Sequence, residues 1–289
     1  GFNEGALVSP ELLSWYTRNS LNYGIDVAFF NHRLKGSADY FFYVTKGGLV
    51  SPADRYVVPL GTALPQIKSE NEHRREGFEA SLRWDDKIGS DFYYEVGTNM
   101  TYYNNLYVKN QGEALSDLKN PYKRSTHQTD YYGIMYMDNG LYQTPEQVLG
   151  VPRRLQSSAT KLGDIAYEDI NGDGKIDGAD QVRWGMPSAP HFTYGFDFVL
   201  GYKGFTLSGL LYGTGKRNME FGVTTKKNEA IWVLNDYQLD YWREDNRDAT
   251  FPRISLEALP NGSNNQAAST FWVKNASFLR LKNLTLEYD

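Results

Sequence analysis

The chain has 289 residues, a formal net charge of −5 and no cysteine. The acidic balance excludes a broad basic surface, so we expect no nucleic-acid partner, and the lack of cysteine excludes disulfide scaffolds and thiolate metal sites. Apolar runs are only a few residues long, so the sequence offers no candidate for a membrane-spanning helix, which needs about 20 apolar residues.

An alternation of apolar and polar residues begins near the start of the chain and returns along its length. In its first stretch Leu21, Tyr23 and Ile25 are apolar, whereas the residues between them are polar or small. A period of two places such side chains on one face of a β-strand. In chain order, this pattern predicts strands at residues 20–30, 34–45, 77–84, 91–103, 191–201, 205–213 and 278–288.

Two residues depart from this alternation. Phe41 is apolar at a position where the pattern of its strand requires a polar residue. In the last strand the alternation slips near Asn283. We expect a β-bulge there, because one extra residue moves the side chains that follow to the opposite face.

The connections between the predicted strands alternate between short and long. Short turns at 31–33, 85–90 and 202–204 alternate with long segments at 46–76, 104–190 and 214–277. In a transmembrane up-and-down barrel the periplasmic turns are short and the extracellular loops are long, and strands of about 10 residues cross the bilayer at a tilt. The sequence therefore predicts an all-β fold, a transmembrane antiparallel up-and-down β-barrel with long extracellular loops, in contact with lipid.

The number of predicted strands indicates a partial barrel domain over residues 1–289. Seven strands leave two unpaired edges, which lipid does not tolerate, so we expect further strands elsewhere in the complete protein. Residues 1–4 show neither the basic start nor the apolar stretch of a signal peptide, which favours a mature or internal piece.

The second long segment contains a stretch that matches the calcium-loop pattern D-x-[DN]-x-[DN]-G. Asp169, Asn171 and Asp173 occupy the positions that supply side-chain oxygens, and Lys175 the position that supplies a backbone carbonyl. Asp180 stands where a bidentate Glu is usual, and its shorter reach predicts weaker binding. These five residues are our candidate ligands for a structural Ca²⁺ ion. A turn of the same composition without an ion is the alternative interpretation.

Several segments together resemble the SusC/RagA family of TonB-dependent outer-membrane transporters, and they follow the family's order over nearly the whole chain. They are GDI at 163–165, DINGDGKID at 169–177, FTYGF at 192–196, YKGF at 202–205 and FLRLKNLTL at 278–286.

This resemblance implies a function that composition and spacing alone do not. It implies part of a roughly 22-stranded barrel in the cell outer membrane, with an N-terminal plug and a SusD-like surface lipoprotein as partner. The whole transporter would import oligosaccharides or peptides with energy from the TonB complex, which acts through the N-terminal part. The 289 residues contain neither a plug nor a TonB box, so we expect the plug domain and the rest of the barrel to be absent from this piece.

Two other classes of protein are alternatives to the transporter. A secreted, calcium-stabilised carbohydrate-binding β-sandwich would use the 22 Tyr and 6 Trp to stack on sugar rings, but it would bury its apolar strand faces in one core. A glycoside hydrolase needs a defined pair of carboxylates, and the sequence singles none out. We therefore expect no enzyme and no catalytic residues.

The polar positions of the strands are the candidates for surfaces that face the barrel lumen. They include Glu79, Arg83, Glu95 and Asn99. A water-filled interior is polar in any such barrel, so these positions do not identify a substrate-binding site. The histidines show no metal-ligand spacing, and we expect turn or surface positions for His32, His73, His127 and His191.

Overall fold

The computed structural model forms two compact units and describes residues 15–50, 67–150, 160–221, 236–254 and 264–289. Unit 1 consists of Gly1–Asp130, Met186–Arg217 and Ala276–Asp289. Unit 2 consists of Tyr131–Gly185 and Asn218–Asn275.

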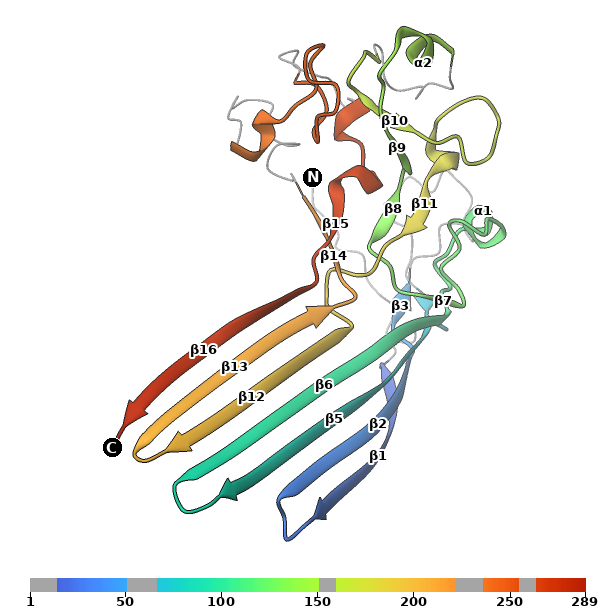
Figure 1. The fold of residues 1–289 in the computed structure, drawn as a ribbon. Helices are drawn as coiled ribbons and strands as arrows, with labels where there is room; N and C mark the ends of the chain where they lie inside the picture. Colours follow the sequence, from blue (N-terminus) through green and yellow to red (C-terminus); the bar gives the residue numbers. More distant parts are fainter. Residues whose placement is uncertain (1–14, 51–66, 151–159, 222–235, 255–263) are drawn as a thin grey trace, which may run out of the picture. The chain divides into compact units, whose positions relative to one another are not determined.

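Unit 1 is dominated by one antiparallel sheet, whose long strands lie side by side in the order β1-β2-β5-β6-β12-β13-β16 (Figure 1). These strands are β1 (Thr17–Phe29), β2 (Leu34–Lys46), β5 (Glu72–Ile88), β6 (Phe92–Lys109), β12 (Phe192–Tyr202), β13 (Phe205–Gly215) and β16 (Phe278–Tyr288). Unit 1 also contains β3 (Leu49–Val50), β4 (Ile67–Lys68), the helix α1 (Leu115–Lys119) and β7 (Gln128–Thr129), which pairs with β6. Every neighbouring pair of long strands is adjacent in chain order.

Each of the seven segments predicted as strands overlaps one of these long strands, and β5 and β6 extend furthest beyond the predicted bounds. β5 continues to Ile88, so the turn predicted at 85–90 shrinks to residues 89–91. Asp85 and Asp86 have the composition of a turn, yet they belong to the strand because their backbone continues the ladder with Glu95 and Tyr94 of β6. Each of them also forms an ion pair. Lys35 lies 3.3 Å from Asp85, and Arg33 lies 3.1 Å from Asp86.

The apolar face of this sheet is exposed. Tyr23 on β1, Leu82 on β5 and Leu286 on β16 are 67%, 49% and 67% exposed, although they are large hydrophobic side chains. Among the described residues, every buried hydrophobic side chain belongs to unit 2. A soluble β-sandwich would cover this face with a second sheet. Within the described residues, this apolar face is therefore not part of a buried core.

The two irregular positions have local explanations. Phe41 lies on the polar face and covers the backbone of its cross-strand neighbour Gly77, where a Cβ atom would lie 2.6 Å from Phe41 Cζ. The bulge predicted near Asn283 is present, because Leu210 pairs with Asn283 whereas Leu211 pairs with Leu281. The residue between these two partners is the extra one, and it restores the apolar face of β16.

Unit 2 is built from short elements, in segments that the sequence predicted as long loops. Its strands are β8 (Gly133–Met135), β9 (Asp138–Leu141), β10 (Ile165–Tyr167), β11 (Val182–Trp184), β14 (Asn218–Glu220) and β15 (Val273–Asn275), and its α-helix is α2 (Pro145–Gly150). Short 3-10 helices lie at Gly178–Asp180, Asp236–Leu239, Asn264–Gln266 and Thr270–Trp272. The strands pair as β8 with β11, β9 with β10 and β14 with β15. In the part of the chain that the structure describes, no helix is long and apolar enough to cross a bilayer.

Unit 2 has a hydrophobic core of its own. Tyr136, Ile165, Tyr167, Ile176 and Trp272 are buried in it, and Ile165 and Ile176 are 0% and 1% exposed. The rings of Tyr136 and Tyr167 pack with their centroids 5.2 Å apart. Burial of this kind stabilises a folded unit in water, so these segments are not structureless connections.

The GDI motif at 163–165 organises this core. Gly163 has a φ of +78° and lies beneath Trp242, so close that a Cβ atom would be 2.4 Å from the indole ring. Asp164 is buried and bonded to Arg253, with Nε 2.7 Å from Oδ1, and it also accepts a 2.9 Å hydrogen bond from Asn265 Nδ2. Each residue of the motif therefore has a separate structural role.

Replacing Asp164 with Asn should destabilise unit 2, because Arg253 loses its charged partner in a mostly buried position. Breaking a buried ion pair costs about 3 to 5 kcal/mol, and the partial exposure of Arg253 favours the lower value. Hydrogen exchange at the Ile165 and Tyr167 amides measures this loss in the native protein, with the exposed Asp248→Asn as control. Equal exchange in the two variants would contradict a stabilising role for the ion pair.

Candidate functional site

The polar residues that the sequence singled out lie together on one face of the unit 1 sheet. Glu79 and Arg83 of β5 share this face with Glu95 and Asn99 of β6, opposite the apolar side chains. Arg83 and Glu95 form an ion pair. Glu79 and Asn99 do not join it. Glu79 instead accepts a 3.5 Å hydrogen bond from Thr101. In the register Arg83 lies opposite Gly97 of β6, and Glu95 and Asn99 lie two residues before and after Gly97.

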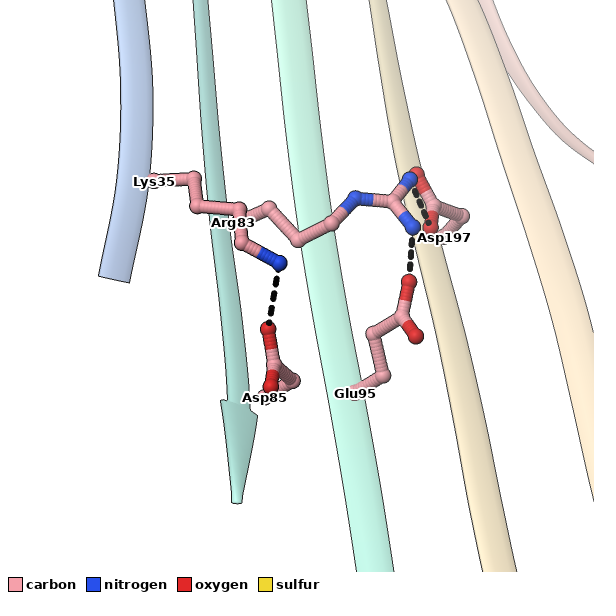
Figure 2. Close-up of polar contacts among 5 residues, drawn as sticks. All are labelled: Lys35, Arg83, Asp85, Glu95 and Asp197. Carbon is pink, nitrogen blue, oxygen red and sulfur yellow. Dashed lines mark hydrogen bonds and ion pairs between the residues drawn. The ribbon is translucent and has the colours of Figure 1, made fainter. Parts of the chain in front are cut away.

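Arg83 lies between two carboxylates from the next two strands, as Figure 2 shows. Its Nη1 atom pairs with Glu95 on β6, and its Nη2 atom lies 3.1 Å from Asp197 Oδ2 on β12. The same view shows Lys35 of β2 bonded to Asp85 of β5. One cation thus connects three strands, and in this cluster its charge is balanced by carboxylates.

Gly97 makes this cluster possible. In the register it lies directly between Arg83 and Asp197, and a Cβ atom there would be only 2.6 Å from Asp197 Oδ1. Without a side chain at this position, the carboxylate can lie across β6 and reach the guanidinium. Sequence reasoning missed Asp197, although it is the polar residue between Phe196 and Phe198 in the alternation of β12.

A second polar feature lies at the end of the sheet where the long connections leave. We call it the arginine–aromatic row, and it consists of Arg18, Tyr43, Arg75, Tyr103 and His191. Arg18 Cζ lies 3.6 Å from the centroid of Tyr43. Arg75 Cζ lies 5.7 Å from the centroid of Tyr43 and 4.6 Å from that of Tyr103. The rings of Tyr103 and His191 are 4.6 Å apart, so cations and rings alternate across neighbouring strands.

A hydrogen-bond chain holds the far end of the row. Arg75 Nε donates to Asn105 Oδ1 at 2.5 Å, and Asn105 Nδ2 donates to Asp130 Oδ2 at 2.7 Å. His191 Nε2 lies 3.1 Å from the same Asp130 oxygen. Burial raises the pKa of Asp130, but the hydrogen bonds from His191 and Asn105 outweigh it and hold that pKa below its usual value. The expectation that His191 is a surface or turn residue was wrong, since it is 3% exposed.

The predicted calcium loop lies in unit 2, and its side-chain oxygens accept hydrogen bonds from the loop itself. Asp169 accepts from the Gly172 and Gly174 amides, both at 2.8 Å. Asn171 Oδ1 accepts from the amide of Asp173, and Asp173 Oδ1 accepts from the amide of Lys175, each at 2.9 Å.

Asp180 closes the loop from its other end. It is 0% exposed, its Oδ1 atom accepts from the Ile170 and Asn171 amides, and its Oδ2 atom accepts from the Asp177 amide. Within the described ranges, no group of three or more His, Cys, Asp or Glu side chains is spaced to hold a metal ion. A carboxylate that accepts one or two hydrogen bonds keeps further lone pairs, so the ligand role of Asp169, Asn171, Asp173, Lys175 and Asp180 stays a prediction.

Comparison with known proteins places the whole chain beside TonB-dependent receptors. No protein-family model matches the chain. TonB-dependent receptor P3 of Formosa agariphila is 26% identical over 96% of this chain and 27% of its own length. TonB-dependent receptor SusC of Bacteroides thetaiotaomicron is 24% identical over 96% of this chain and 26% of its own length.

Solved structures share the fold. The RagAB peptide importer in its open-open state matches with a TM-score of 0.66 and 20% identity, over 96% of this chain and 28% of that one. Another structure of the RagAB peptide transporter matches with a TM-score of 0.63 and 19% identity, over 96% of this chain and 29% of that one. The sheet of unit 1 therefore corresponds to part of a barrel, and the chain spans less than a third of the length of each of these proteins.

The calcium prediction can be tested by isothermal titration of chelator-treated native protein with Ca²⁺. Asp173→Asn keeps the oxygen that accepts from the Lys175 amide but removes one negative charge, so we expect Ca²⁺ affinity to fall by about tenfold, roughly 1.4 kcal/mol. Glu168→Gln, just outside the pattern, is the matched control and should change affinity less. If the unaltered protein gives no calcium heat, the alternative of an ion-free turn is correct.

Proposed function

Because the chain is part of a SusC/RagA-type TonB-dependent receptor, an outer-membrane protein and not an enzyme, we propose that its sheet is one segment of a roughly 22-stranded transmembrane barrel. The complete receptor would import oligosaccharides or peptides. The observation that supports this proposal best is the exposed apolar face, which suits hydrocarbon, on a sheet whose other face carries paired charges.

Aromatic residues near both ends of the strands support a membrane crossing. On the apolar face of β6, Phe92 and Tyr102 stand ten residues apart. This separation is about 33 Å along a strand, or about 25 Å across the membrane at a tilt of about 40°. The apolar band of outer-membrane barrels has about this height and is flanked by aromatic girdles. Phe205 and Tyr288 pack 4.5 Å apart at the turn end, and Phe78 packs 5.6 Å from Tyr102 at the other.

The connections give the proposed barrel its direction. The turns β1–β2, β5–β6 and β12–β13 are short and lie at one end of the sheet, whereas the segments that contribute unit 2 leave from the other. Long connections are extracellular in such barrels, so unit 2 would belong to the outer surface and the short turns to the periplasm. The polar face with Arg83 would then line the lumen.

Partners and substrates follow from the proposed membership in a complete receptor. The solved RagAB structures are of a peptide importer, which supports a peptide substrate and a SusD-like surface lipoprotein as partner. The likeness to SusC leaves oligosaccharides as the other substrate class. The TonB complex would act through a part of the receptor outside these residues.

Purification from native outer membranes in detergent tests this function. We expect the receptor to co-purify with a surface lipoprotein. Deletion of the receptor gene should abolish uptake of one class of oligosaccharide or peptide. Recovery of a soluble monomer in detergent-free buffer would overturn the proposal and favour the secreted carbohydrate-binding sandwich.

The lipid contact makes a separate prediction on β5. Leu82→Arg places a charge on the apolar face near the middle of the strand, at an expected cost of about 2 to 4 kcal/mol. We expect less folded receptor in the outer membrane, measured as the band that resists SDS without heating. Ser81→Arg is the matched control, because Ser81 lies on the polar face, where its hydroxyl is 2.7 Å from that of Ser37. Equal assembly of both variants would argue against lipid at the apolar face.

A further inference from the structure

Two arginines on the same face of β5 have opposite surroundings. Arg83 pairs with two carboxylates, whereas Arg75, eight residues earlier, bonds the neutral side chain of Asn105. Among the described residues, Arg75 has no carboxylate partner and no acceptor for its terminal nitrogens. Because β5 lies between β2 and β6, its neighbours within the sheet are all described, so the sheet itself supplies no counter-charge.

The Arg75 guanidinium is nevertheless held in place. It lies between Tyr43 on β2 and Tyr103 on β6, and both rings contact it as cation–π partners. Asn105 fixes its Nε atom. A guanidinium ordered in this way loses less conformational entropy when it binds a ligand, which favours affinity.

A second arginine lies against the same ring as Arg75. Arg18 stacks on the far side of Tyr43 and adds a second guanidinium, also without a described carboxylate partner. Asp130 is the carboxylate nearest the far end of the row, but Asn105 and His191 bond its Oδ2 atom. Two cations therefore stand beside aromatic rings, and among the described residues neither of them has a carboxylate as a direct partner.

From these contacts we propose that the arginine–aromatic row binds a carboxylate group of the imported oligomer, so that the receptor selects carboxylate-bearing substrates. The planar fork of Arg75 matches such groups with two parallel hydrogen bonds. The rings of Tyr43 and Tyr103 offer surfaces for a sugar ring or a peptide unit. The inference rests on the proposed import function.

The position of the row fits a site for incoming substrate. Arg75 lies near the start of β5 and Tyr43 near the end of β2, both at the end of the sheet where the long connections leave. The Arg83 cluster, in contrast, lies further along β5 toward the short turns. A solute that enters from the side of the long connections would meet the unpaired cations first.

The test uses the complete receptor purified with its lipoprotein partner, and titration calorimetry with four probes. The probes are trigalacturonate, its neutral methyl ester, a tetrapeptide with two Asp residues and the same peptide with Asn. We expect one acidic probe to bind at least about tenfold more tightly than its neutral counterpart, since hydrogen bonds to charged groups are the stronger ones. Which acidic probe binds will separate a glycan from a peptide source.

Three variants locate the effect. Arg75→Gln should bring the affinity ratio of acidic to neutral probe close to one, with little change for the neutral probe. Arg75→Lys keeps the charge but not the planar fork, so its ratio should be intermediate. Lys35→Gln removes one positive charge from the same face at the other end of the strands and should leave the ratio unchanged. The band that resists SDS without heating verifies that each variant is folded.

Two results would overturn the inference. One is equal affinity of the native complex for acidic and neutral probes, or binding of none of them. The other is an unchanged ratio in Arg75→Gln. Either result leaves the proposed import function standing if the receptor still co-purifies with a lipoprotein, so the two failures are distinguishable.

Discussion

The antiparallel ladder of unit 1 is the constraint on which the rest of the structure depends. Along β6 the backbone pairs with β5 on one side and β12 on the other, so its polar groups are satisfied within the sheet. Because the backbone groups are paired, one face can carry apolar side chains against hydrocarbon, where an unpaired amide would cost about 5 kcal/mol. The alternation follows from the same requirement, and the extra residue in β16 restores the apolar face where the alternation slips.

The two units reach stability by different routes. Unit 2 buries Ile165, Tyr167 and Trp272 in a hydrophobic core, which is stable in water. The sheet of unit 1 has hydrogen bonds, cross-strand ring contacts and ion pairs instead. Those ion pairs are partly exposed, with the Arg83 side chain 46% exposed, and exposed pairs contribute at most about 1 kcal/mol each. The sheet therefore does not depend on any one ion pair of its polar face. For this reason Arg83 can be paired with carboxylates while Arg75 is not, without loss of the sheet.

Local patterns in the sequence predicted what is local in the structure. The period of two located all seven long strands because neighbouring residues alone determine which face a side chain occupies. The end of β5 was mispredicted because Asp85, which has the composition of a turn residue, pairs in the ladder with Glu95 of β6. The arginine–aromatic row could not be predicted at all, since Tyr43, Arg75 and Tyr103 meet only through the register of three strands. Phe41 was noticed as an exception, but its explanation at Gly77 also needed the register.

The predicted calcium loop is held in place by contacts of its own, apart from any ion. Asp180 ties the start of the loop to its end through three backbone amides, and Ile176 anchors the loop in the core at 1% exposure. These contacts therefore hold the loop in its conformation without a bound ion. If Asp180 keeps its amide partners when calcium binds, its two oxygens cannot both turn to the ion, and water must complete the shell. Fewer charged protein ligands mean weaker binding. Calcium at this site would then stiffen a loop that is already formed, in contrast to metal domains that fold only with their ion.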